Sequence, residues 1–277
     1  MSRLARAVTE SRDPDDCPPF RSGAVAPVIC VLGGCGGVGA TRFAAVLASV
    51  AAARYGQAVL LDLDPAGGGI DIGLGIESVP GARWSGLRVA GGHLDPAALL
   101  QGVPRWGLTH VVAADTAEMP APGTVSQVLA AAGEVAPVVA DLSRWGDAAR
   151  TATLSRADLV VLVVADDVPG VAAARSVVSA LGTGCLDPDQ GTGFELCAGL
   201  ELGPGFELGP AVDPKLVGAV VRTRSSRPAA AIAELTGARL LGRLAPIRAR
   251  TDSILEADAL PRLDRQVAAD VLSRTLS

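Results

Sequence analysis

LGGCGGVGATR, at residues 32–42, is the most informative stretch of this 277-residue sequence. It follows the apolar run VICVL at 28–32 and overlaps the start of a segment, 41–54, whose apolar residues recur at helical spacing. A glycine-rich turn between a buried strand and a helix presents backbone N–H groups at the positive end of that helix. The stretch therefore predicts an anion site, and phosphate is the usual anion in such sites.

The glycine spacing fits two kinds of phosphate-binding loop. From Gly34 to Gly39 it matches the dinucleotide fingerprint G-x-G-x-x-G, and Asp62, at the end of the next apolar run, is a candidate ribose-binding acid. The same two glycines, followed by Ala40 and Thr41, also match a P-loop, except that Ala40 stands where the phosphate-binding lysine belongs. Thr41 keeps the hydroxyl that P-loops give to Mg²⁺.

Acidic residues at the ends of two predicted strands favour the P-loop. The run at 58–63 leads into DLDPAGG at 62–68, which carries Asp62 and Asp64, and Asp141 ends a second run at 137–141. Two carboxylates two residues apart suit Mg²⁺ and a water beside a phosphate chain, whereas a ribose needs only one acid. The dinucleotide interpretation remains as an alternative.

Apolar runs alternate with segments of helical periodicity along the rest of the chain. Strands are expected at 28–32, 58–63, 109–113, 137–142, 159–165, 217–222 and 239–244. Helices are expected at 41–54, 124–132, 171–181 and 228–235, with a core-docked terminal helix at 263–276. This alternation implies an α/β fold in which helices cover both faces of a mostly parallel sheet.

The ends of the chain and one internal segment depart from this pattern. Residues 1–25 are polar and are expected to form a disordered leader, followed by a single domain over 26–277. Within 187–214, three copies of a six-residue unit (FELCAG, LELGPG and FELGPA, at 194–211) predict an extended surface loop, with an acidic partner-binding strip as the alternative.

Composition limits the possible functions. Hydrophobic residues make up 49% of the chain and aromatic residues 3%, so a full core must be built mainly from Ala, Val and Leu. The net charge of −5 argues against a generally basic nucleic-acid surface. The 5 cysteines form no pairs at metal-binding spacing, which favours a reduced cytosol.

The motifs also resemble those of a known family. CGGVGAT at 35–41 resembles the deviant Walker A loop of the MinD/ParA class of P-loop ATPases, and LDLDPAGG at 61–68 resembles their second-strand motif. Within that class the sequence is most similar to the CpaE/TadZ branch, whose actinobacterial members are encoded beside secretion and pilus genes and are often labelled septum-site-determining proteins. Softer matches are GARW at 81–84, a run at 94–105, DLSR at 141–144 and SRADLVVLVV at 155–164.

The resemblance implies roles for the matching residues. Thr41 would bind Mg²⁺, with Asp141 in the outer shell of the ion through water. Asp64 would position the attacking water with support from Asp62, and the base would lie near Arg222 and 245–246. The phosphates of ATP or ADP would be wrapped by the loop residues Gly34, Cys35, Gly36, Gly37, Val38, Gly39, Ala40, Thr41 and Arg42.

Two departures from the family pattern concern lysines. Cys35 replaces the signature lysine and Ala40 the P-loop lysine, while the only lysine of the chain is Lys215. Because each charge-assisted hydrogen bond contributes roughly 1.5–3 kcal/mol, two losses would weaken triphosphate binding on the order of 10²–10⁴-fold. Arg42 is a candidate substitute, with a solvated helix residue as the alternative. Cys35 is expected to be an inert small residue, although the helix N-terminus should lower its pKa.

The sequence therefore predicts a nucleotide-binding positioning or scaffold protein for pilus or secretion machinery or for the septum site, with weak or absent ATP hydrolysis. An active ATPase with a substitute arginine and an NAD(P)-binding oxidoreductase are the alternatives. Expected partners are pilus, secretion or cell-division proteins, and no nucleic acid is expected. A homodimer and a peripheral membrane association of this cytoplasmic protein are left open. A leader of about 25 residues is expected to be too short for the receiver-like domain found in CpaE proteins.

Overall fold

A computed structural model describes residues 26–87, 93–144, 147–182, 212–213, 216–224, 226–247, 255–257 and 260–275. The predicted leader at 1–25 and the three six-residue repeats at 194–211 lie outside the described residues. The predictions about those two segments therefore stay predictions.

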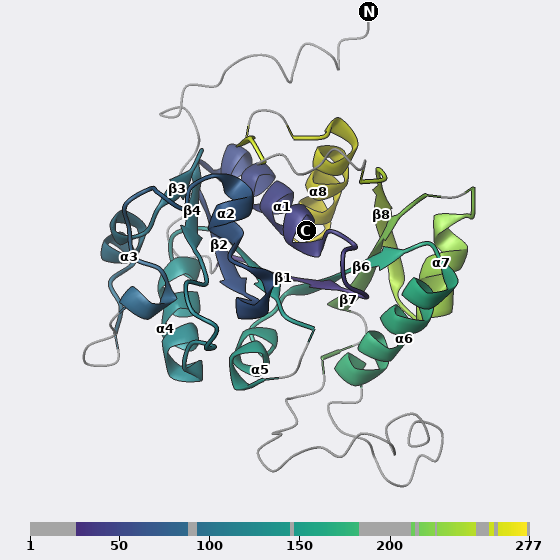
Figure 1. Ribbon diagram of the computed structural model, residues 1–277, viewed down its shortest axis with the longest axis horizontal. Helices are drawn as coiled ribbons and strands as arrows, with labels where there is room; N and C mark the ends of the chain where they lie inside the picture. The colour runs from purple at the N-terminus through teal and green to yellow at the C-terminus, as the bar shows by residue number, and fades with distance from the viewer. Residues whose placement is uncertain are drawn as a thin grey trace, which may run out of the picture.

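Within the described residues, eight strands form one sheet, in the order β3-β4-β2-β5-β1-β6-β7-β8 (Figure 1). Neighbouring strands pair in parallel except β3, which is antiparallel to β4. The expected α/β fold with a mostly parallel sheet is confirmed. The strands are β1 (Val28–Gly33), β2 (Ala58–Leu63), β3 (Arg105–Trp106), β4 (Thr109–Val112), β5 (Val138–Leu142), β6 (Leu159–Ala165), β7 (Val217–Arg222) and β8 (Arg239–Leu244).

The helices connect these strands, and three of the described ones were not predicted from the periodicity: the five-residue α2 and the two capped helices α3 and α5. Both α3 and α5 have only seven residues and begin at an aspartate whose carboxylate caps the first turn: Asp95 accepts from Ala98 N at 2.7 Å, and Asp147 from Arg150 N at 2.7 Å. The elements are α1 (Ala40–Tyr55), α2 (Ile70–Leu74), α3 (Pro96–Gly102), α4 (Pro122–Gly133), α5 (Ala148–Leu154), α6 (Val168–Gly182), α7 (Ala229–Thr236) and α8 (Arg262–Thr275), with short 3₁₀ turns η3 (Pro65–Gly67) and η4 (Trp84–Gly86).

The helices cover both faces of the sheet (Figure 1). Side chains alternate along β1, so that Cys30 and Leu32 face the layer of α4, α5, α6 and α7, while Ile29 and Val31 face the layer of α1, α2 and α8. Both layers consist mainly of Ala, Val and Leu, as the low aromatic content requires. Phe43 of α1 is among the largest fully buried side chains.

The last helix is docked on the core, as expected. Val267, Ala268, Val271 and Leu272 of α8 are buried in the same layer as α1. Gly242 of β8 permits this approach, because a Cβ there would lie 2.6 Å from Val267 Cγ1. α8 therefore rests directly on the backbone of β8.

Gly242→Ala should lower the free energy of unfolding by about 1–3 kcal/mol, because the added methyl overpacks the contact between α8 and β8. Gly123→Ala in α4 is the matched control, since nothing lies within 4 Å of the added Cβ there. Urea unfolding followed by circular dichroism measures both. Equal stability of the two variants would contradict the described docking of α8.

Candidate functional site

The predicted glycine loop joins β1 to α1 at the carboxyl edge of the sheet. Gly34 donates its N–H to Val163 O at 2.9 Å, and a Cβ at Gly34 would lie 2.8 Å from Ala174 Cβ, so only glycine fits between β6 and α6. Gly39 has φ +83°, and a Cβ there would lie 2.6 Å from Ile247 Cδ1. Local geometry therefore accounts for the first and last glycines of the predicted phosphate loop.

The N-terminus of α1 retains the features of an anion site. No side chain caps it, and its first turn carries no acidic residue. The amides of that turn have no partner within the helix by geometry, so they are suited to an anionic ligand. Along the loop, Gly36, Gly37 and Thr41 are exposed, Cys35, Gly39, Ala40 and Arg42 are partly buried, and Gly34 and Val38 are buried.

Asp141 lies beside the end of this loop. It pairs in register with Val31 of β1 and is only 2% exposed. Its carboxyl group hydrogen-bonds the Thr41 side chain, yet Oδ2 has no hydrogen-bond partner within the described residues. Burial, helped by the negative charges of Asp62 and Asp64, raises the pKa of Asp141 to about 8, although the hydrogen bond with Thr41 opposes the rise.

An orphaned carboxylate oxygen next to a hydroxyl fits a hydrated divalent cation. Mg²⁺ keeps several waters and takes few protein ligands when phosphates supply the rest. Thr41 and Asp141 are the residues that would hold such an ion, directly or through water. Among the described residues, no three His, Cys, Asp or Glu side chains converge to bind a metal by themselves.

Asp62, at the end of β2, is hydrogen-bonded to the backbone around it. Its carboxylate accepts three backbone N–H groups, from Asp64 at 3.1 Å, Ile70 at 2.8 Å and Ala114 at 3.1 Å. Burial raises its pKa, and these three hydrogen bonds lower it. Asp62 thus holds the segment after β2 to the end of β4, and its predicted support of Asp64 stays a prediction.

Asp64 is the second carboxylate of the same motif. It is partly buried, and its side chain folds over η3, where Oδ2 lies 3.3 Å from the position of a Cβ on Gly67. It is close enough to Asp62 and Asp141 to raise the pKa of each. The structure therefore brings Asp64, Asp141 and Thr41 to the same edge of the sheet.

Arg222, which was expected near the nucleotide base, contacts the loop itself. Its Nε donates to Val38 O at 2.7 Å, and its Nη1 donates to Ala245 O at 2.6 Å and lies 3.8 Å from Asp264 Oδ2. The side chain is 3% exposed, and Nη2 has no hydrogen-bond partner among the described residues. Arg222 therefore ties the glycine loop to the ends of β7 and β8, a role that its sequence position did not reveal.

The thiol of Cys35 is less acidic than expected. Burial and the charge of Asp167 raise its pKa, and the lowering by Arg144 and Arg224 does not offset them. The predicted lowering by the helix N-terminus was wrong because desolvation of the thiolate outweighs it. This agrees with the expectation that Cys35 is an inert small residue.

The GARW stretch at 81–84 braces the same edge of the sheet. Arg83 pairs with Asp71 at 3.2 Å and donates to the carbonyls of Ile76, Glu77, Val79 and Gly81. Trp84 Nε1 donates to Asp62 O at 2.6 Å. Both side chains fix the segment that follows the Asp62 and Asp64 motif, so this match to the family is structural.

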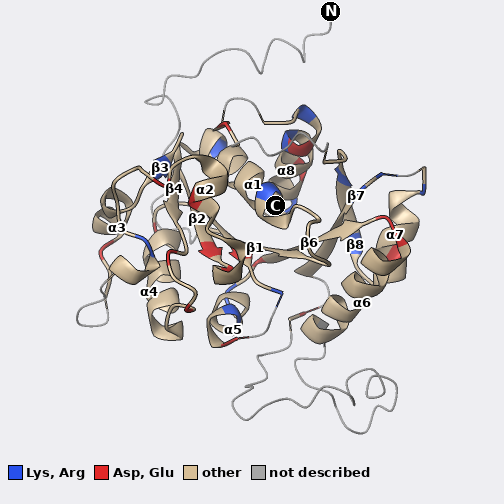
Figure 2. Cartoon of the chain, viewed as in Figure 1, with Lys and Arg blue, Asp and Glu red and all other residues tan. Residues whose placement is uncertain are grey.

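Charged residues gather around the loop. In Figure 2, acidic segments are drawn near the labels of β1 and β2, with basic segments toward α1 and α5. Arg42, in the first turn of α1, is close enough to Arg222 to lower the pKa of that guanidinium, as is Arg224. The loop without lysines therefore lies among arginines from other strands and from its own helix.

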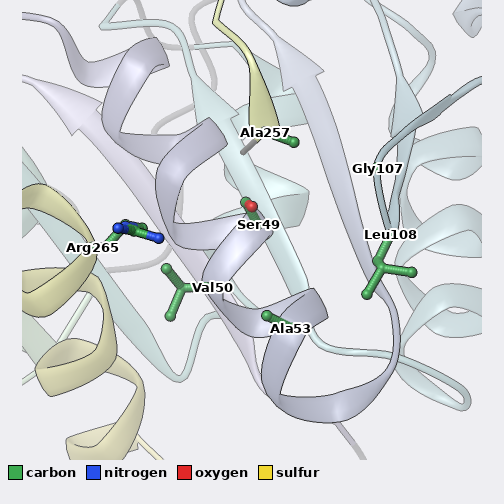
Figure 3. A pocket seen from close by; sticks show the side chains of 7 residues that line it. All are labelled: Ser49, Val50, Ala53, Gly107, Leu108, Ala257 and Arg265. Carbon is green, nitrogen blue, oxygen red and sulfur yellow. The ribbon is translucent and has the colours of Figure 1, made fainter. Parts of the chain in front are cut away.

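A cavity of about 300 Å³ lies elsewhere, between α1, the turn from β3 to β4 and α8 (Figure 3). Ser49, Val50 and Ala53 line it from α1, with Gly107, Leu108, Ala257 and Arg265 opposite them. Ser49, the lining residue of α1 nearest the glycine loop, is nine residues beyond the start of α1, or about 14 Å along the helix axis. The cavity is therefore separate from the glycine loop.

Comparison with curated proteins finds relatives without an assigned function. No protein-family model matches the sequence. Uncharacterized protein MT3760 and Uncharacterized protein Rv3660c, from two strains of Mycobacterium tuberculosis, are each 40% identical over 185 residues. The match covers 65% of this chain and 49% of each relative, so the chain spans about half the length of the curated relatives it matches.

Solved MinD and ParA structures share the fold. The cell division ATPase MinD of Pyrococcus furiosus matches with a TM-score of 0.60 and 14% identity, over 90% of this chain and 99% of that chain. A ParA family ATPase of Chlorobium tepidum matches with a TM-score of 0.57 and 15% identity, over 90% of this chain and 98% of that chain. MinD of Pyrococcus horikoshii, complexed with Mg-ADP, matches with a TM-score of 0.56 and 16% identity, over 89% of this chain and 96% of that chain. The chain therefore has the MinD/ParA P-loop NTPase fold.

Strand order argues against the dinucleotide alternative. In the dinucleotide-binding fold β1 lies directly beside β2, whereas here β5 separates them. The carboxylate of Asp62, the acid proposed for the ribose, also accepts hydrogen bonds from three backbone amides.

In the part of the chain that the structure describes, no helix has the length and apolar character needed to cross a membrane.

Asp62→Ala should lower the free energy of unfolding by about 2–4 kcal/mol, because it leaves three backbone N–H groups without their acceptor. Asp64→Ala, two residues away in the same motif, should change it by less than about 1 kcal/mol. Chemical denaturation of the two variants checks the difference. A destabilisation by Asp64→Ala as large as that by Asp62→Ala would contradict the division of roles.

The pKa of Asp141 predicts a pH-dependent stability. The pKa is raised to about 8 in the folded chain from about 3.9 in the unfolded chain. The contribution of protonated Asp141 to the free energy of unfolding is therefore complete below pH about 4 and falls as the pH rises toward 8. Asp141→Asn removes that charge. Without divalent cations it should be more stable than the wild type at pH 8, by on the order of 1–4 kcal/mol. The difference should shrink toward pH 4 in thermal unfolding, and a pH-independent difference would refute the shift.

Proposed function

We propose that this chain is a nucleotide-binding positioning or scaffold protein of the MinD/ParA class, of the CpaE/TadZ type. It binds ADP or ATP together with Mg²⁺ through residues 34–42, and it hydrolyses ATP slowly or not at all. The observation that carries this proposal is the uncapped glycine loop with Thr41 and the buried Asp141 at its end. The amides of the loop suit the phosphates, and the orphaned carboxylate oxygen suits the metal ion. A metal-bound polyphosphate is the ligand that uses both features at once.

Weak binding and slow turnover follow from the missing lysines. A P-loop lysine reaches the β- and γ-phosphates and stabilises the charge that develops in phosphoryl transfer. Ala40 and Cys35 offer no cation at those two positions. Backbone amides remain for the ground state of the bound nucleotide, but the larger loss falls on the transition state. A nucleotide would then act here as a ligand that fixes a conformation rather than as a substrate.

The cellular role is proposed from the resemblance of the motifs and from the fold. Solved neighbours include a protein named for cell division and a ParA family ATPase. By analogy, the partners would be proteins of a pilus or secretion machine or of the division site, and a homodimer is the assembly to test first. The fold analogy supports the cell-division role, and the resemblance of the motifs alone supports the pilus or secretion role.

An active ATPase is the second candidate, and the arginines near the loop favour it. Arg42 lies in the first turn of α1, and the positive charge of Arg222 is held against Val38 O of the loop. A guanidinium can stabilise transition-state charge on a phosphoryl group as an arginine finger does. In this alternative Asp64 positions the attacking water.

Calorimetry with Mg-ADP, Mg-ATP and NADH tests the binding. We expect binding of the adenine nucleotides in preference to NADH. Thr41→Ala should weaken Mg-ADP binding by roughly tenfold or more, the loss that about 1.4 kcal/mol produces. Thr275→Ala is the matched control and should bind as the wild type does. Thr275 lies at the end of α8, about 16 Å along the helix from Asp264, the residue of α8 that lies beside Arg222. Preferential binding of NADH would overturn the proposal.

Phosphate release from Mg-ATP separates the two candidates. Nucleotide binding with no release above the buffer rate supports the scaffold. Release that Asp64→Ala abolishes, while nucleotide binding persists, supports the active ATPase instead.

A further inference from the structure

The glycine loop has a cation above its open side that comes from another strand. Arg144 follows β5 by two residues, and its Nη2 lies 3.6 Å from the position that a Cβ on Gly36 would occupy. Its charge also acts on the neighbouring Cys35 thiol, where it opposes the rise in pKa that burial and Asp167 cause. Both Arg144 and Gly36 are exposed to solvent, unlike the buried Arg222 behind the loop. Arg144 therefore stands on the side from which a ligand reaches the loop.

The backbone that carries Arg144 is anchored to the core. Ser143 donates its N–H to Leu63 O at 3.0 Å. The carbonyl of Arg144 accepts from Arg150 Nη1 at 3.2 Å, and Arg150 is buried in α5. The backbone is thus ordered before a ligand binds, so that only the side chain of Arg144 has to lose conformational entropy on binding.

Other charged groups lie along the same loop. Asp141, three residues before Arg144, has its unpartnered buried oxygen next to Thr41 at the far end of the loop. The charges of Arg224 and Asp167 also act on Cys35, with opposite signs. A polyphosphate across the loop would thus have a cation site at one end and a guanidinium at the other.

We propose that Arg144 is the cation that replaces the missing lysine, by binding the terminal phosphate oxygens of the nucleotide held on the loop. This rests on the proposed nucleotide binding and extends it to a residue outside the loop motif. A guanidinium can bind two phosphate oxygens at once, whereas an ammonium acts as a point charge. With Arg144 in place of the loop lysine, the positive charge would come from the end of β5, the strand that also carries Asp141, instead of from the loop.

Titration calorimetry with Mg-ATP and Mg-ADP tests the proposal. Arg144→Ala should weaken Mg-ATP binding by roughly ten- to one-hundredfold, the loss of one charge-assisted hydrogen bond, and should weaken Mg-ADP less. Arg156→Ala is the matched control: Arg156 is also exposed, but it lies in the turn that enters β6 at the opposite edge of the sheet. It should leave both affinities unchanged.

A rescue variant separates ligand binding from an effect on the fold. Cys35→Lys in the Arg144→Ala background returns a cation to the loop and should recover most of the lost Mg-ATP affinity. Thermal unfolding should show the same melting temperature for wild type and Arg144→Ala. An Arg144→Ala protein that binds Mg-ATP as the wild type does would overturn the role of Arg144 and leave the proposed nucleotide binding intact. A wild type that binds neither nucleotide would overturn both.

Alkylation of Cys35 tests the position of Arg144 without any nucleotide. Iodoacetamide labelling, followed by mass spectrometry of the Cys35 peptide, should be slower in Arg144→Ala than in wild type, because a positive charge beside the thiol is lost. The buried Cys30, whose pKa is raised to about 12, is the internal control and should stay unlabelled. Equal labelling rates of Cys35 in the two proteins would show that Arg144 does not lie over the loop, and would overturn the proposal.

Discussion

The backbone amides at the start of α1 are the constraint around which the carboxyl edge of this sheet is arranged. Close packing of Gly34 against α6 and the left-handed conformation of Gly39 set the path of the loop, and Arg222 ties it to β7 and β8. β5 lies directly beside β1, so Asp141 arrives next to Thr41 without any loop having to carry it. The fold itself therefore places an anion site and a buried acid side by side.

The charge balance of this edge distinguishes it from an ordinary P-loop. No lysine lies in the loop, but Arg42, Arg144, Arg222 and Arg224 surround it from α1, from β5 and from β7. Burial limits what each can do: Arg222 is enclosed and holds the loop, whereas Arg144 is exposed above it. Such a site can favour a bound polyphosphate in its ground state while lacking a cation within the loop for catalysis.

Sequence predicted the fold better than the division of labour within the site. Every apolar run that was predicted as a strand is one, because strands buried on both faces must be apolar throughout. The helices α2, α3 and α5 were missed because five to seven residues are too few for a periodic signal, although Asp95 and Asp147 are recognisable caps of α3 and α5. The structural role of Asp62 was missed because sequence cannot show that three backbone amides donate to its carboxylate.

The softer family matches mark structural contacts rather than the site. Arg83 and Trp84 brace the segment after β2, and the Asp158 carboxylate accepts from Val28 N at 2.8 Å at the start of β1. Arg144 is the exception, because it projects over the loop. Its position depends on the packing of β5 against β1, which no local pattern encodes.

The central claim is that the loop amides still hold a polyphosphate without a lysine. The most direct measurement is a nuclear magnetic resonance titration of ¹⁵N-labelled protein with Mg-ADP, following the backbone amides of residues 34–42. The claim predicts that these amides shift most and that the changes saturate. Amides that stay unmoved at saturating nucleotide, or shifts confined to another part of the chain, would contradict it.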